Sequence, residues 1–210
     1  MDKNKIAVAL FDKLAIRYQQ KYMDVNLYAN TLDFFCNHLK KNNAEVLELA
    51  CGPGNITQYV LKRRPDFRVL GTDLSERMLA LAKINNPNAD FQILDCRALA
   101  SVQKKYDAVI CGFCCPYLSK QEITTLISDT CKSLKSRGLL YLSTIEGDHA
   151  KSGFKKGSTG EEIFMHYYQA DYLVTILEKN GFKVINLVRK TYQIHDEEAT
   201  DLIIISQLNS

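Results

Sequence analysis

The sequence predicts an α/β fold, in which a mostly parallel, doubly wound sheet carries helices on both faces. A short apolar run at 46–50 ends in the glycine-rich turn C-G-P-G, and a helical pattern follows it from Ile56 to Leu61. A second apolar run at 67–72 ends at an acid, Asp73. Apolar runs of strand length then alternate with helical patterns along the chain, which is typical of βαβ units.

The glycine-rich turn predicts a ligand site. Gly52 and Gly54 let the backbone approach a ligand closely, and Asn55 is expected to be the N-cap of the helix that follows. A strand, a glycine turn and a helix N-terminus together indicate a nucleotide or dinucleotide site. Asp73 stands about 20 residues further on, where such folds hold the two ribose hydroxyls.

Details of the turn argue against a dinucleotide. A dinucleotide fingerprint requires a third glycine where this chain has Thr57, so close packing against a pyrophosphate is not provided for. Pro53 between the glycines and Glu48 inside the strand fit a ligand without phosphates and with a charged amino-acid end. An NAD-dependent enzyme is therefore disfavoured.

Four motifs in register resemble one family. Residues 46–57 (V-L-E-L-A-C-G-P-G-N-I-T) resemble motif I of class I S-adenosyl-L-methionine (SAM)-dependent methyltransferases, small-molecule type 11/25. G-T-D-L-S at 71–75, I-L-D-C at 93–96 and Y-D-A-V-I at 106–110 resemble the family's next three signatures. The resemblance spans roughly residues 8–206. It implies a Rossmann-like seven-stranded sheet of order 3-2-1-4-5-7-6, with the last-inserted strand antiparallel.

The same resemblance implies one domain over 1–210, in which N-terminal helices at 1–43 cover the cofactor pocket of a core at 44–210. F-D-K-L-A-I-R-Y-Q-Q-K-Y at 11–22 resembles the opening helix of such proteins, with Gln19 in place of an acid. The implied cofactor is SAM, and the implied product is S-adenosyl-L-homocysteine (SAH).

Roles in binding SAM are carried over residue by residue. Asp73 would hold the ribose, Asp95 the adenine amino group, and Tyr22, together with Tyr18, would close over the methionine end. Tyr22 can equally pack its helix onto the core, and Asp95 can equally cap the turn that follows it. The expected cofactor-binding residues are Tyr22, Glu48, Ala50, Gly52, Gly54, Asp73, Leu74, Met78, Asp95, Cys96, Cys111, Gly112 and Phe113.

The remaining elements follow from periodicity and capping signals. Helices are expected at 3–22, 27–40, 76–84 (capped by Ser75), 120–135 (ended by Gly138) and 172–179. Strands are expected at 90–94, 106–112, 139–145, 183–188 and 200–207. The stretch 147–160, rich in Gly, Ser and Lys, is predicted to be a substrate-covering lid. Its Lys155 and Lys156 can attract an anionic substrate or form a solvated basic loop.

Three residues are candidates for the chemistry of transfer. Pro116-Tyr117 follows the fourth strand without the Asn or Asp that precedes it in base-methylating relatives, which argues against exocyclic base methylation. Tyr117 is expected to line the transfer site or to pack the core. His149 is the first candidate for a general base and His166 the second, since His titrates near neutral pH; a surface role is the alternative for each.

Composition and charge limit the classes of protein to which the chain can belong. The chain has 210 residues and a formal net charge of +3, which gives no case for a nucleic-acid or membrane surface. No apolar run reaches the ~18 residues of a membrane helix. The start M-D-K-N-K leads into a helix rather than a signal peptide, so a cytoplasmic protein is expected.

Cysteine usage indicates reduced thiols. Seven cysteines do not make a disulfide framework. Cys111, Cys114 and Cys115 are clustered and raise the question of a metal, yet no second Cys or His pair stands at zinc-finger spacing. The sequence therefore predicts no metal site.

The function expected from these observations is methyl transfer from SAM to a small-molecule acceptor by a monomer or homodimer, without a nucleic-acid or membrane partner. An RNA or protein methyltransferase is the alternative among enzymes. A SAM- or SAH-binding protein without catalysis is the alternative among binding proteins.

Overall fold

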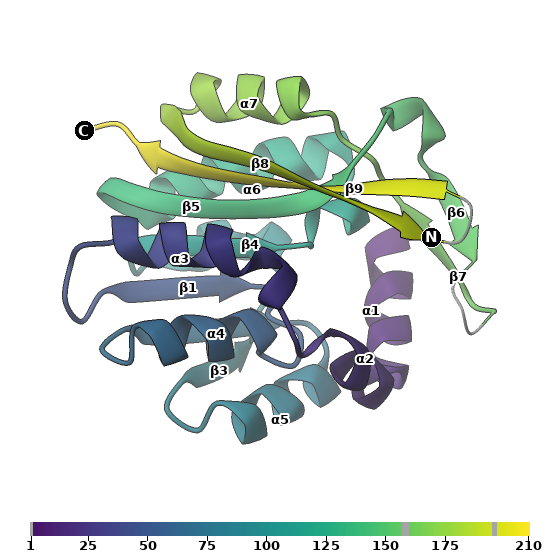
Figure 1. Ribbon diagram of the computed structural model, residues 1–210, viewed down its shortest axis with the longest axis horizontal. Coiled ribbons are helices and arrows are strands. Elements are labelled where there is room, and N and C mark those ends of the chain that lie inside the picture. Colours follow the sequence, from purple (N-terminus) through teal and green to yellow (C-terminus); the bar gives the residue numbers. More distant parts are fainter. Residues whose placement is uncertain (1, 157–159, 195–196) are drawn as a thin grey trace.

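The computed structural model describes residues 2–156, 160–194 and 197–210. Within them, a seven-stranded mixed sheet has the order β3-β2-β1-β4-β5-β9-β8 (Figure 1). The strands are β1 (Glu45–Leu49), β2 (Arg68–Asp73), β3 (Asp90–Ile93), β4 (Tyr106–Gly112), β5 (Leu134–Glu146), β8 (Phe182–Ile194) and β9 (Glu197–Leu208).

The sheet confirms the predicted architecture. β9 runs antiparallel to both β5 and β8, whereas β3, β2, β1, β4 and β5 pair in parallel. The order matches the predicted 3-2-1-4-5-7-6, because a separate hairpin of β6 (Gly153–Lys156) and β7 (Glu162–Met165) takes two labels before the last strands.

Helices cover both faces, as the apolar strands require. α3 (Ala29–His38) and α4 (Asn55–Arg63) pack on one face with Val46 of β1. α6 (Lys120–Ser133) and α7 (Ala170–Lys179) pack on the other face with Leu47. Short 3-10 turns are η2 (Cys96–Ser101), η3 (Cys115–Tyr117) and η4 (His149–Lys151).

The N-terminal segment lies beyond the carboxyl ends of the parallel strands (Figure 1). The helix expected over 3–22 is two helices, α1 (Lys3–Lys13) and α2 (Ala15–Tyr22), because Leu14 leaves helical geometry with φ −98° and ψ 10°. A 3-10 turn, η1 (Asn26–Tyr28), then precedes α3. α1 and α2 both contact α5 (Glu76–Asn85), which Ser75 caps as predicted.

Two predicted helix boundaries are wrong. Asn55 is the first residue of α4 rather than its N-cap, and Gly54 is the cap because it takes the left-handed conformation at φ 76°. Gly138 does not end α6, since that helix stops at Ser133 and β5 begins at once at Leu134. Leu134 pairs with Tyr106 of β4, so the strand starts earlier than the apolar run at 139–145 suggests.

The predicted lid contains a hairpin. Within 147–160, the described residues form η4 and β6, which pairs with β7; positions 157–159 lie outside the described residues. The hairpin packs against α1, where Lys13 forms a salt bridge of 2.9 Å with Glu161 and the Lys3 ammonium lies 3.4 Å above the Phe164 ring. None of the helices in the described ranges combines the length and apolar character needed to span a bilayer.

Candidate functional site

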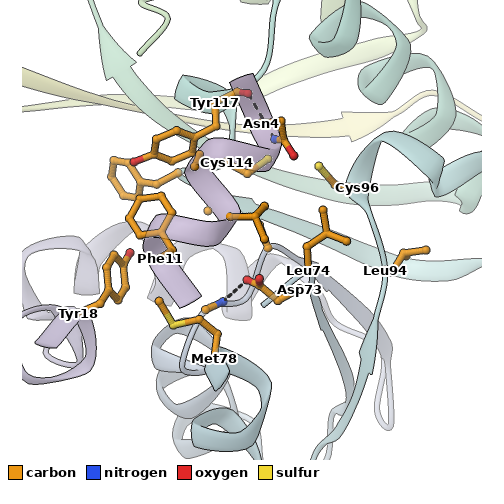
Figure 2. Close-up of a pocket in the computed structure, with 16 residues that line it drawn as sticks. Asn4, Phe11, Tyr18, Asp73, Leu74, Met78, Leu94, Cys96, Cys114 and Tyr117 are labelled. Carbon is orange, nitrogen blue, oxygen red and sulfur yellow. Dashed lines mark hydrogen bonds between the residues drawn. The ribbon is translucent and has the colours of Figure 1, made fainter. Parts of the chain in front are cut away.

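A cavity lies where the carboxyl ends of β1, β2 and β4 meet α1 and α2. It holds about 780 Å³ of unfilled space, part of which is open to solvent. Figure 2 shows aromatic side chains along one side and Asp73 with Leu74 across from them. The lining residues are Asn4, Ala7, Val8, Phe11, Tyr18, Ala50, Gly52, Asp73, Leu74, Met78, Leu94, Cys96, Gly112, Phe113, Cys114 and Tyr117.

The glycine turn forms the floor of the cavity. Ala50, Gly52 and Gly54 take positive φ values of 52°, 53° and 76°. A Cβ on Gly54 would stand 2.4 Å from Nδ2 of Asn86, so α4 can approach α5 only with glycine at this position. Ala50 adopts a conformation that costs about 1 kcal/mol or more for a residue with a Cβ, and such strain is concentrated at functional sites.

Asp73 is held toward the cavity by two backbone amides. Its Oδ2 accepts a hydrogen bond from the Gly52 amide and its Oδ1 accepts one from the Ser75 amide, each 2.9 Å long. Burial raises the pKa of this carboxyl, against the lowering effect of these amides. A carboxylate has about four acceptor sites, so the group can still accept hydrogen bonds from a pair of vicinal hydroxyls.

Glu48 lies behind the turn rather than in the cavity wall. It is fully buried, and the hydroxyl of Thr57 donates a hydrogen bond to Oε2 of Glu48. Burial raises the pKa of Glu48 to about 8. Thr57, the residue that replaces the third glycine of a dinucleotide fingerprint, therefore supports the acid of β1. Gly54 also lies outside the lining, as the cap of α4.

The segment after β4 forms a second wall. Phe113 takes a left-handed φ of 53°, and its amide donates to both the carbonyl oxygen and Oγ of Ser143 at 3.1 Å. Its ring packs on Tyr28 with centroids 5.3 Å apart. A Cβ on Gly112 would meet Cδ1 of Ile56 at 2.4 Å, so the Ile56 side chain would have to move. Cys111 is buried behind this wall.

Aromatic rings close the cavity on the side of the N-terminal helices. Phe11 packs edge-on against Tyr18 and Tyr117, with centroids 5.6 Å and 5.1 Å away. Tyr22 does not line the cavity; it stacks behind Tyr18 at 4.7 Å and is 43% exposed. The side-chain amide of Asn4 donates to the carbonyl oxygen of Tyr117 at 3.4 Å, which ties α1 to η3.

The loop after β3 carries Asp95 and Cys96, the two residues expected to bind adenine, but only Cys96 lines the cavity. Asp95 does not line the cavity: it caps η2 by accepting from the Arg97 amide at 2.9 Å, and it pairs with the Arg97 guanidinium at 2.7 Å. Burial raises its pKa, but the Arg97 interactions outweigh this effect and lower it overall. Cys96 and Leu94 do line the cavity.

The two candidate bases, His149 and His166, lie together outside the cavity lining. Their rings stack with centroids 5.9 Å apart, and Nδ1 of His149 is 3.1 Å from the carbonyl oxygen of Tyr167. Burial, with the charges of His149 and Lys3, lowers the pKa of His166. His166 remains close to the site through its backbone amide, which donates to the Pro116 carbonyl at 2.8 Å.

The N-terminal helix contributes lining residues that the sequence reasoning missed. Asn4, Ala7, Val8 and Phe11 follow the i, i+3, i+4, i+7 pattern of one helix face, a signal present in the sequence but interrupted by a polar Asn. Leu94 and Cys114 were also missed, although each neighbours an expected residue in the chain.

Comparisons with known proteins agree with this architecture. A family model described as a methyltransferase domain matches residues 46–138. A protein assigned as a methyltransferase in Invertebrate iridescent virus 6 is 29% identical over 89% of this chain and 78% of its own length. The malonyl-[acyl-carrier protein] O-methyltransferase of Acetivibrio thermocellus is 30% identical over 69% of this chain, but over only 50% of its own length.

The fold comparison covers the whole chain. Magnesium protoporphyrin IX methyltransferase from Synechocystis PCC 6803, solved with bound SAM, superposes with a TM-score of 0.76 at 19% identity, over 100% of this chain and 98% of that one. The fold is that of class I methyltransferases. Residues 46–138 match the methyltransferase-domain family, and the sheet topology agrees with this match.

Proposed function

We propose that this chain binds SAM in the cavity at the carboxyl ends of β1, β2 and β4 and transfers its methyl group to a small-molecule acceptor. The observation that carries the proposal is the carboxylate of Asp73, which two backbone amides hold at the cavity beside a glycine turn that has Thr57 in place of the third glycine of a dinucleotide fingerprint. This is the arrangement that binds a ribose diol.

The other lining residues fit the remaining parts of such a cofactor. Met78 and Leu74 provide apolar surface next to Asp73 for a flat base, with the backbone amide of Cys96 close by. The turn at 50–54 and the buried acid behind it, Glu48, suit the polar amino-acid end. Tyr22 and Asp95 do not line the cavity. Tyr22 would act by supporting Tyr18, and Asp95 would act by fixing the conformation of the loop at Cys96.

Methyl transfer from a sulfonium needs little beyond placement. SAM supplies a methyl group that is already activated, so the protein chiefly provides proximity and orientation. Burial, with the nearby phenols of Tyr18 and Tyr22, raises the pKa of Tyr117. Tyr117 thus stays protonated at neutral pH and orients the acceptor by donating a hydrogen bond. His149 and His166 remain the candidates for a base when the acceptor carries a proton.

A small acceptor is favoured by the enclosure of the site. α1 and α2 lie over the carboxyl ends of the strands and supply part of the cavity lining, from Asn4 to Tyr18. The formal net charge of +3 is small and does not by itself indicate an RNA-binding protein.

The first test is calorimetric titration of the full chain with SAM, SAH and NAD. Binding of both adenosyl ligands and not of NAD is expected. Absence of adenosyl binding would overturn the proposal. Radiolabelled SAM then separates the alternatives: label in small metabolites supports the proposed acceptor class, label in protein or RNA replaces it, and binding without any transfer identifies a non-catalytic SAM-binding protein.

A further inference from the structure

Three cysteine side chains converge at the carboxyl end of β4. The Sγ atoms of Cys111, Cys114 and Cys115 all lie within 4.8 Å of one another, and the three residues are 1%, 5% and 0% exposed. Among the residues that the structure describes, this is the one group of three His, Cys, Asp or Glu side chains placed closely enough to hold a metal ion.

The backbone fixes this cluster in advance. Cys111 and Cys114 lie on either side of the left-handed turn at Phe113, whose amide is hydrogen-bonded to Ser143. This turn brings their Sγ atoms to 2.9 Å. The carbonyls of Cys114 and Cys115 accept the amides of Tyr117 and Leu118 at 3.0 Å and 3.1 Å, which closes η3. The conformation that forms the cavity wall therefore also assembles the thiols.

A fourth sulfur reaches the cluster from another loop. Cys96 follows β3 and points at Cys114, and both side chains line the cavity (Figure 2). The spacing of these cysteines in the sequence is not that of a zinc finger, because Cys96 is distant from Cys114 in the chain and approaches it only in the folded protein. The cavity also gives an ion a path to otherwise buried thiols.

We propose that Cys111, Cys114 and Cys115 bind a soft metal ion such as Zn²⁺ beside the cofactor cavity, with the fourth position on the side of Cys96. Thiolates select soft ions, and a Zn–S bond of about 2.3 Å places sulfurs about 3.8 Å apart in a tetrahedral site. The Cys111–Cys114 pair must open by about 1 Å from 2.9 Å, and the other two sulfur separations, each within 4.8 Å, must adjust to a similar value. Each thiol that binds releases its proton.

The competing chemistry is a disulfide. Cys111 and Cys114 have the C-x-x-C spacing of redox pairs, and a mild disulfide oxidant would take two electrons and two protons from them. That reaction uses two sulfurs and gives no role to Cys115 or Cys96, whereas a metal uses the cluster as a unit.

The test is titration of the reduced full chain, without oxygen, with Cd²⁺ and with Zn²⁺. We expect one ion per chain, a cadmium–thiolate charge-transfer band, and X-ray absorption of the zinc form showing three or four sulfur neighbours at about 2.3 Å. Cys115→Ser should weaken binding at least about tenfold, and Cys131→Ser, whose thiol lies outside the cluster, should not.

The wild-type measurement alone can overturn the proposal. No stoichiometric ion binding with all thiols reduced refutes it, as does zinc bound by nitrogen and oxygen only. Unchanged affinity in a folded Cys115→Ser variant also refutes it. If mild oxidation joins Cys111 to Cys114 and the reduced chain binds no ion, the cluster is a redox pair. SAM titration is a separate measurement, so failure here leaves the methyltransferase proposal intact.

Discussion

The carboxylate of Asp73 accepts a 2.9 Å hydrogen bond from the backbone amide of Gly52, a residue 21 positions earlier in the chain. This bond joins the end of β2 to the turn after β1, so the two halves of the candidate cofactor site are held as one unit. The second oxygen of Asp73 binds the Ser75 amide, which fixes the carboxylate plane before any ligand arrives. Such preorganisation reduces the ordering that a ligand must impose.

Replacing Asp73 by Asn should weaken SAM and SAH binding by about tenfold to a hundredfold. A hydrogen bond to a charged group contributes roughly 1.5–3 kcal/mol, and the Asn amide would also place a donor against a backbone N–H. Calorimetry measures the affinity. The matched control is Asp90→Asn, an exposed acid at the start of β3. Equal affinities for the two variants would remove Asp73 from the site.

Glu48 should make the fold less stable as the pH rises. Its folded-state pKa is about 8 and its ordinary value is 4.5, so between these values the folded chain keeps a proton that the unfolded chain has lost. Raising the pH through this window therefore lowers the free energy of unfolding, and below pH 4.5 the contribution is constant. Burial is the largest cause of the raised pKa; the hydrogen bond from the Thr57 hydroxyl opposes it, and the charge of Asp73 raises the pKa further.

Glu48→Gln, which mimics the protonated acid, should flatten this dependence. Urea unfolding from about pH 5 to about pH 8 measures it. Asp73 and Asp201 also have raised pKa values and act in the same direction, so the difference between wild type and variant isolates Glu48. Glu76→Gln, an exposed residue of α5, should keep the wild-type slope. An unchanged slope in Glu48→Gln would show that Glu48 titrates normally.

The sequence predicted the sheet because each strand carries its own signal. Val46 and Leu47 are both apolar although they face opposite sides, which marks a buried parallel strand. The position of the antiparallel strand in the sheet was predicted from the resemblance to class I methyltransferases. The prediction that Gly138 ends the helix was wrong. A glycine after an amphipathic run usually caps a helix, but here Leu134 already pairs with Tyr106, so β5 begins before Gly138.

Site residues were predictable where they belong to local motifs. Gly52 and Asp73 lie in such motifs, and both line the cavity. The place of Asn4 in the site and the orientation of Cys96 toward Cys114 depend on segments that are distant in sequence and meet only in the folded chain. His149 and His166 were chosen because His titrates near neutral pH and because they follow the predicted fifth strand, in or close to the predicted lid. Periodicity cannot say which way a loop side chain points.

Ala50→Gly should stabilise the protein by about 1 kcal/mol. Ala50 has a φ of 52°, a conformation that disfavours any residue with a Cβ. Urea unfolding measures the gain. The control is Ala80→Gly in α5, where glycine should instead cost about 1 kcal/mol because the position is helical. Opposite signs are therefore expected, and a loss at Ala50 as large as that at Ala80 would contradict the strain.

Tyr117→Phe should lower turnover by about fivefold and leave SAM affinity unchanged, because it removes a hydrogen-bond donor worth about 1 kcal/mol from the cavity wall. Steady-state kinetics with calorimetry separates the two effects. His149→Ala is the comparison: its ring lies outside the lining and is occupied by Tyr167, so its loss should reduce turnover less. A larger loss in His149→Ala than in Tyr117→Phe, with SAM affinity kept, would instead assign His149 as the base and require the hairpin to bring it into the cavity when substrate binds.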